Sequence, residues 1–433
     1  MLGGGKFTAF NKKLPGTYIN FVSSKRATPG LGSRGIAAVA LNMNWGNDTD
    51  IFEIGIDEFN KNSLKILGYD YSADELKNIR EIFRNAQKLY IYRLNNGGAK
   101  AQNIYATAKY SGTRGNALKV IIAKNIDNDD KYDVSLYLGN VLVDKQTVAN
   151  ANELVDNDFV VYKKNANLNT SAGVPLEGGT NGETTNQSHQ NFIDKLESYD
   201  FNALCCSSKE STIQSLYINF TKRMRDDVGV KFQTIVYNQA ADHEGIVNVA
   251  SDTDDADNVN GLVYWVTGVI AGCEINKSNT NKVYDGEYEI VTSLTQKELE
   301  VSLEEGKFVC HKVGEEIRVL EDINSLITLT DEKGEDFKNN QTIRVIDQLA
   351  TDVASLFNEK YLGLVSNNAS GRVSLWNDIV TLYKNYYQMQ AIENFESNEI
   401  TVEQGDDKKT VVVNGNITPL NCMSKLYMTI LVS

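Results

Sequence analysis

Proline, cysteine and histidine are scarce in this sequence, at 4, 5 and 3 of 433 residues. The five cysteines are an odd number without metal-ligand spacing, so we expect reduced thiols that pack as small apolar side chains. Three histidines offer few candidates for a catalytic base. Cys310 and His311 are neighbours on a predicted strand, where adjacent side chains point to opposite faces, and so do not form a catalytic pair.

Long apolar runs are also missing. No stretch approaches the roughly 20 apolar residues that cross a bilayer, and the start, MLGGGKFTAFNKKLPG, lacks the apolar core of a signal peptide. We therefore expect synthesis in the cytoplasm and no direct membrane insertion. Acidic residues outnumber basic ones by 57 to 43, a formal charge of −14. This charge disfavours nucleic acid as a partner.

Motifs that carry chemistry are absent as well. The carboxylates of Asp252–Asp257 could bind a cation, but an EF-hand loop starting there needs Gly in place of Asp257 and Glu in place of Val263. We expect a solvated loop. The glycines of 178–183, GGTNGE, come without the Lys-Ser/Thr pair of a phosphate-binding loop and predict a flexible connector. The sequence thus predicts no catalytic residue, metal or cofactor, and a protein that is not an enzyme.

What the chain does contain is an alternation of strands and helices. The first half predicts a buried strand from Ile36, a helix opened by a Ser72/Glu75 capping box, and a strand at 89–94. Further on, the strands 201–208 and 232–238 flank a predicted helix near 212–227. Because both strands are apolar on both faces, they indicate a βαβ unit in a parallel or mixed sheet.

A segment with a different sequence pattern lies between these two α/β stretches. Short strands alternate with Asn, Asp and Gly turns, at 118–123, 132–138, 141–148 and 159–164. This pattern predicts a small all-β unit inserted into the α/β body. We expect it to end in a polar linker, 165–190, that contributes nothing to a core.

The C-terminal third predicts two long helices. A helix at about 258–273 and a β-rich stretch over 283–330 precede them. The helix at 341–361 carries one apolar stripe, a second helix covers 372–392, and a hairpin turns around Gly405.

Both ends of the chain predict strands. TYINFV at 17–22 is rich in β-forming residues, and in LYMTILV at 426–432 every second residue is apolar. An unpaired strand edge offers its N–H and C=O groups to any neighbour. A strand in the subunit's own sheet remains the alternative for the C-terminal run.

Several segments together resemble tail sheath proteins of contractile phages, above all the short sheaths of Gram-positive myophages, defective prophages and phage-tail-like bacteriocins. They are AKYSGTRGNALKVII (108–122), GGTNG (178–182), VTGVIAGCEINKSNTNKVYDGE (266–287), the stretch 323–372 and the terminal strand.

This resemblance implies a fold and an assembly. The fold would be an α/β body near an inner tube, with an inserted small all-β domain and extended terminal strand arms. The expected domains are 1–30 (N-terminal arm and linker), 31–97 plus 183–415 (core), 98–182 (outer β-rich domain) and 416–433 (C-terminal arm).

The assembly would be a homopolymer of stacked hexameric rings around an inner tail tube, with baseplate and tail terminator proteins as further partners. The arms would pair with neighbours by strand exchange through Tyr18, Ile19, Phe21, Val22, Leu426, Met428, Ile430 and Val432. One of the two long helices would face the tube, the second through Arg372, Asn377 and Lys384.

Two other classes of protein stay open on the residues alone. A doubly wound α/β enzyme rests only on the βαβ pattern, without a glycine fingerprint or a nucleophile. Another self-assembling surface or structural protein would also fit. The sequence does not distinguish a complete phage from a headless particle.

Overall fold

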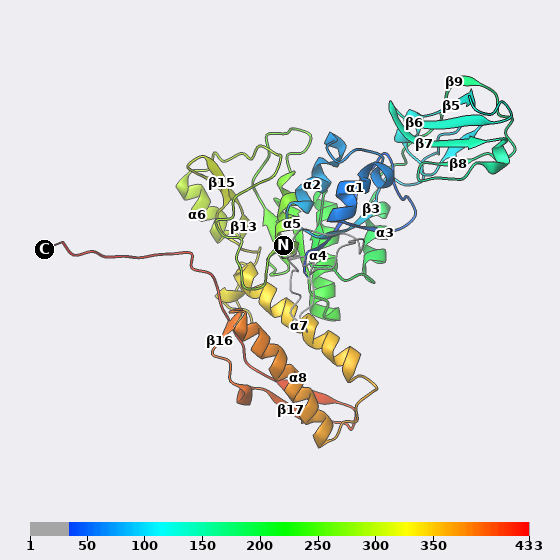
Figure 1. Cartoon of the computed structure of the whole chain (residues 1–433). Helices are drawn as coiled ribbons and strands as arrows, with labels where there is room; N and C mark the ends of the chain where they lie inside the picture. Colours follow the sequence, from blue (N-terminus) through cyan, green and yellow to red (C-terminus); the bar gives the residue numbers. More distant parts are fainter. Residues whose placement is uncertain (1–33, 433) are drawn as a thin grey trace, which may run out of the picture.

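A seven-stranded sheet forms the centre of the protein in a computed structural model that describes residues 34–432 (Figure 1). The strand order is β13-β12-β11-β10-β1-β3-β2, with β2 antiparallel and the other strands parallel. The strands are β1 (Ile36–Leu41), β2 (Phe52–Gly55), β3 (Lys88–Arg93), β10 (Ala203–Cys205), β11 (Gln233–Tyr237), β12 (Ile246–Val249) and β13 (Lys307–Phe308).

Helices cover both faces of this sheet. One face packs on α1 (Ile56–Leu67), α2 (Lys77–Phe83) and α5 (Leu262–Gly272), and the other on α3 (Asn186–Leu196) and α4 (Ser211–Lys222). Burial on both faces explains the continuous apolar strands. The βαβ unit β10-α4-β11 is confirmed, with Ala203 opposite Gln233 in parallel register.

The β-rich unit projects from one side of the body (Figure 1). Its sheets have the orders β7-β6-β5-β9 and β4-β8 and enclose one apolar core. The strands are β4 (Ala106–Ala108), β5 (Leu118–Lys124), β6 (Tyr132–Leu138), β7 (Val141–Val148), β8 (Val160–Tyr162) and β9 (Ser171–Pro175). The expected fold class, an α/β body with an inserted all-β unit, is confirmed.

The linker prediction for 165–190 was wrong. It contains β9, which pairs with β5, and the first turn of α3. Leu168 and Leu176 are buried in the β-unit core. Buried apolar side chains and backbone pairing together hold this polar segment to the sheet.

The glycine-rich 178–183 segment is also not a flexible connector. Gly179 exchanges two hydrogen bonds with the Asn116 side chain, both 2.8 Å, and Gly182 N donates to Asn95 O at 3.1 Å. A Cβ on Gly182 would lie 1.6 Å from Asn96 O. These glycines therefore allow two backbones to touch where the chain returns to the body.

Two further local predictions need correction. Ser72 caps no helix: its Oγ donates to Asp70 Oδ1 at 2.9 Å, and Ala73 occupies the N-cap of a short 3-10 turn. The stretch 283–330 is not purely β, because α6 (Gln296–Glu304) lies within it before β14 (Cys310–Val313) and β15 (Glu316–Val319). The Thr295/Glu298 capping box starts α6.

A helical layer lies against the body and carries the C-terminal segment (Figure 1). Helices α7 (Asn340–Lys360) and α8 (Ala369–Gln388) confirm the two predicted long helices, and β17 (Thr401–Gln404) with β18 (Val411–Asn414) forms the predicted hairpin. Strand β16 (Ile392–Glu393) pairs with β19 (Thr418–Pro419). Across residues 34–432, no helix combines the length and apolarity needed to span a membrane.

Candidate functional site

The C-terminal segment is fixed to the helical layer as far as residue 422. Leu420 N donates to Ala391 O at 2.9 Å, and its carbonyl accepts from Gln341 Nε2 at 3.0 Å. Gln341 also accepts from Cys422 N at 3.0 Å, and Thr342 Oγ1 donates to Asn421 Oδ1 at 3.2 Å. The first turn of α7 thus clamps the root of the segment.

Beyond Cys422 the chain leaves the body and runs into solvent (Figure 1). Residues 420–432 form no strand in this single chain. The four predicted pairing residues are all exposed, Leu426 by 86%, Met428 by 72%, Ile430 by 70% and Val432 by 94%. Met423, Tyr427 and Leu431 are exposed too.

This exposure has a physical consequence. Scattered surface apolar residues are ordinary, but a contiguous run of this kind marks an interaction site. An extended chain with free backbone groups and apolar side chains is the form that adds to a sheet edge. The alternative of a strand in the subunit's own sheet finds no pairing partner among residues 34–432.

The N-terminal pairing residues Tyr18, Ile19, Phe21 and Val22 lie outside the described residues. Their pairing stays a prediction.

The candidate tube-facing residues occupy two different settings on α8. Asn377 and Lys384 are exposed, and Lys384 has no ion pair among residues 34–432. Arg372 is half-buried and donates to the Asn367 side chain at 2.9 Å. Lys384 therefore offers a free charge, whereas Arg372 also stabilises its own loop.

Buried ion pairs that no sequence pattern predicted hold α7 against the body. Arg344 donates to Asp322 Oδ2 at 3.1 Å with both side chains fully buried. Arg225 and Asp347 pair at 2.6 Å. The signal was available, because charged residues interrupt the buried face of α7.

The second helix is tied to α7 by a polar contact. Tyr386 Oη, on α8, donates to Asp352 Oδ2 at 2.7 Å, and Gln348 Nε2 donates to Asp352 Oδ1 at 2.8 Å. A buried charge without its partner lowers the free energy of unfolding. The ion pairs of α7 and this polar contact therefore allow few alternative placements of the helical layer.

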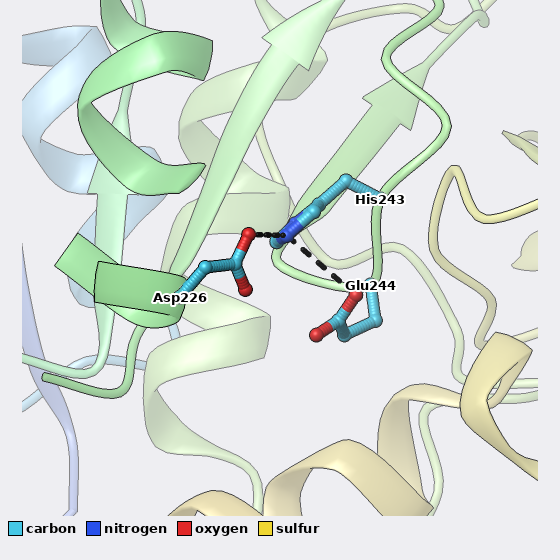
Figure 2. A group of neighbouring side chains, drawn as sticks. All are labelled: Asp226, His243 and Glu244. Carbon is cyan, nitrogen blue, oxygen red and sulfur yellow. Dashed lines mark hydrogen bonds and ion pairs between the residues drawn. The ribbon is translucent and has the colours of Figure 1, made fainter. Parts of the chain in front are cut away.

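One cluster brings metal-ligand side chains together. Asp226, His243 and Glu244 point toward one another (Figure 2). Their possible ligand atoms all lie within 4.8 Å of one another. However, His243 Nδ1 accepts from Gly245 N at 2.9 Å, so the proton of the neutral ring sits on Nε2, 3.1 Å from Asp226 Oδ2. Glu244 is held by Lys333 at 2.9 Å. Hydrogen bonds account for the cluster, and its protonated Nε2 is not a metal ligand.

Three of the five cysteines, Cys205, Cys206 and Cys310, are packed in the core as expected, whereas Cys273 is half-buried and Cys422 is exposed. Burial raises the pKa of the Cys206 and Cys310 thiols to about 12, which keeps them in the unreactive thiol form. His189 is buried against Tyr217, with Nδ1 3.0 Å from its Oη. The Asp252–Asp257 loop is held by Asp255, which accepts from Asp257 N and Asn258 N at 3.1 Å.

The fold and its exposed segment define a class of protein: a structural subunit that presents an apolar extended arm. Comparisons with known families then give its identity. Four phage tail sheath domain models match successive parts of the chain. They are the Gp18 domain III N-terminal region (34–94), the beta-sandwich domain (90–181), the central domain (182–325) and the C-terminal domain (332–433).

A solved structure and a relative found by sequence agree with this assignment. The sheath tail protein of Desulfitobacterium hafniense is 32% identical, with a TM-score of 0.82 over 95% of this chain and 99% of that one. The phage-like element PBSX protein XkdK of Bacillus subtilis is 28% identical over 99% of both chains. The chain belongs to the phage tail sheath protein family, and its role is that of a contractile tail sheath subunit.

A more distant structure shares only the fold. The helical sheath of the anti-feeding prophage, in its contracted state, is 12% identical with a TM-score of 0.55 and covers 97% of this chain.

Proposed function

We propose that this subunit polymerises as stacked hexameric rings around an inner tail tube, and that its terminal arms link neighbours by strand exchange. The observation that carries the proposal is the C-terminal segment, which is anchored through Cys422 and then exposes a run of apolar side chains. Membership of a polymer-forming family supports a second copy as its partner.

Strand exchange suits a lattice that must move. Main-chain hydrogen bonds supply cohesion, while alternate side chains such as Met428 and Ile430 set the register. The polymer would stay linked through extended chains while the compact bodies rotate about their roots. In this proposal the N-terminal strand at 17–22 forms a second link, and 1–30 and 416–433 are the two arms.

The energy for contraction would come from contacts between subunits, without chemical catalysis. Burial of apolar surface contributes about 25 cal/mol per Å². Repeated over a long polymer, a modest gain in contact area per subunit supplies mechanical work. The extended sheath would therefore be a metastable lattice that assembles on a baseplate and is closed by a tail terminator.

In this proposal α8, the second of the two long helices, contacts the tube. Its exposed face carries Asn377 and Lys384, which would meet complementary groups on the tube in the extended state. The β-rich unit at 98–182 would face outward, and the whole assembly would be a phage or phage-tail-like particle.

Electron microscopy tests the proposal directly. Purified protein, alone and co-expressed with the tube protein, is examined by negative staining at increasing concentration. We expect tubes or stacked rings with six-fold symmetry in end-on views. A compact monomer that never assembles, with or without the tube protein, would refute the proposed polymer.

A further inference from the structure

The entry of the described chain into the body is fixed by one arginine. Arg34 Nε donates to Cys273 O and Nη2 to Ile270 O, both at 3.2 Å, at the C-terminal end of α5. Its Nη1 reaches Gln348 Oε1 on α7 at 3.4 Å. A guanidinium at a helix C-terminus satisfies carbonyls that lack partners in the helix.

The next two residues are held as firmly. Gly35 N and Ile36 N both donate to Asn202 Oδ1, at 3.0 and 3.1 Å, and Gly35 O accepts from Gln87 N at 2.8 Å. Gly35 has a φ of +105°, a conformation that favours glycine. The position at which residues 1–33 join the body is therefore determined by the fold.

A cavity of about 370 Å³ lies beside this junction. Ile36 and Asn202 line one end, the loop 229–231 forms one wall, and α7 forms the other. A smaller adjoining cavity has Arg34 in its wall and shares Asn202, Lys231, Gln348 and Thr351 with the larger one. Arg34 thus stands at the end of one continuous groove.

Apart from the buried Gln348, the wall contributed by α7 is made of small, exposed side chains. They are Ala350, Thr351, Ala354 and Ser355, followed one turn later by Asn358. Small side chains let a second backbone approach closely. The residues before Arg34 read TPGLGS (28–33), a thin chain with two glycines and a single large apolar side chain, Leu31.

Both signs of charge line the cavity, through the exposed Asp200 and through Lys231. Charge therefore does not select the occupant, and the choice rests on position. Residues 28–33 directly precede Arg34, which stands at the end of the groove.

We propose that residues 28–33 of the same chain lie in this groove along α7, with Leu31 against Ala354. The groove would act as a guide that sets the direction in which the N-terminal arm leaves the subunit. The seating itself does not depend on assembly, whereas its role as a guide rests on the proposed function of the arm.

Engineered cysteines test the seating in the unassembled chain. Leu31→Cys is combined with Ala354→Cys in a Cys422→Ser background, which removes the exposed native thiol. The control pairs Leu31→Cys with Asn377→Cys, an exposed site on α8. We expect the first pair to form an intramolecular disulfide at least about ten times faster, because tethered groups held together have a high effective concentration.

The cross-linked products are identified by intact-mass analysis at low protein concentration, and three outcomes are possible. Fast cross-linking within one chain supports the proposal. Equal rates for the two pairs would overturn it. Cross-linking only between separate Leu31→Cys and Ala354→Cys chains would also overturn it, because the groove would then hold a neighbour's segment.

A second measurement needs no substitution near the groove. Hydrogen exchange of the wild-type monomer should be slowed by about tenfold or more at residues 30–33 relative to residues 3–6. Ala354→Trp, at an exposed position, should remove this protection without unfolding the body. If neither the cross-linking preference nor the slowed exchange is found in a protein that still forms rings, the seating of residues 28–33 in the groove is rejected. The proposed polymer would be unaffected by that result.

Discussion

Arg225 and Asp347 form a buried, two-point ion pair, with Nη1 to Oδ2 at 2.6 Å and Nη2 to Oδ1 at 2.8 Å. The arginine lies in the π-helical turn Arg223–Val228 at the end of α4, and the aspartate lies on α7. Arg225 Nη1 also donates to Phe232 O at 2.7 Å. This pair joins the sheet body to the helical layer.

Removal of one partner of the Arg225–Asp347 pair should lower the free energy of unfolding. Asp347→Ala leaves the Arg225 guanidinium buried and unpaired, and we expect a loss of about 3–5 kcal/mol in the free energy of unfolding. Urea titration followed by circular dichroism measures the loss. Asp158→Ala, which breaks an exposed pair with Lys65 at 3.7 Å, is the control and should cost about 1 kcal/mol or less.

A paired replacement separates the charge effect from packing. Arg225→Met with Asp347→Leu should recover most of the stability lost in Asp347→Ala, because no unpaired charge remains. A double variant as unstable as the single one would show that the pair acts through shape and not through charge.

Glu81 should make stability depend on pH near neutrality. This α2 side chain is fully buried, and burial raises the pKa of its carboxyl group to about 7. Between pH 4.5 and 7 the folded protein holds a proton that the unfolded chain has lost, so this group's contribution to stability falls as the pH rises.

Glu81→Gln isolates this effect from the other carboxylates. Glu81 has two hydrogen-bond partners, Glu287 N and the Tyr284 hydroxyl. The amide of Gln can still accept from Glu287 N and form a hydrogen bond with the Tyr284 hydroxyl. The variant should match the wild type near pH 5 and exceed it in stability at pH 8, as measured by thermal unfolding. Glu75→Gln, at an exposed position, should show no such divergence; an equal response of both variants would contradict the prediction.

Deletion of residues 423–433 should abolish assembly and leave the monomer folded. The hydrogen bonds of the root end at Cys422, so we expect a change in unfolding free energy of no more than about 0.5 kcal/mol. Light scattering measures assembly and urea titration measures stability. A truncated chain that unfolds would place these residues in its own core.

Substitutions in alternate phase test strand pairing within the same segment. Met428→Asp with Ile430→Asp places charges on one face, and Tyr427→Asp with Thr429→Asp places them on the other. If the segment pairs as a strand with one buried face, the first variant should lose assembly and the second should keep most of it. Equal loss in both would argue against a register set by side chains.

Charge reversal at Lys384 should weaken assembly on the tube. Lys384 is exposed and has no ion pair among residues 34–432, so Lys384→Glu should leave the monomer's unfolding free energy within about 0.5 kcal/mol of the wild type. The fraction of tubes covered by sheath is counted in micrographs. Lys297→Glu on the exposed face of α6 is the control, and unchanged coverage in Lys384→Glu would remove α8 as the tube contact.

Sequence patterns predicted the regular elements well where one physical signal was dominant. The strands β1, β10 and β11 could be identified because burial on both faces favours apolar residues, although β11 also buries Gln233 and Thr234. The long helices α7 and α8 followed from their length and periodicity.

Predictions failed where a few tertiary contacts outweighed local composition. The Ser72 hydroxyl donates to Asp70 and so forms no capping box. Leu168 and Leu176 are buried in the β-unit core, which places a polar stretch of the chain beside that unit. The charged pairs that hold α7 are separated by 22 residues for Arg344–Asp322 and 122 for Arg225–Asp347. No local pattern encodes such a partner.

The C-terminal arm shows both sides of this division. The alternation of Leu426, Met428, Ile430 and Val432 is determined by the sequence alone, because strand geometry places every second side chain on one face. Only the tertiary structure decided where the arm begins, because Gln341 and Thr342 must fold beside residues 420–422 to clamp its root. Sequence set the chemistry of the arm, and long-range packing set the point at which it leaves the body.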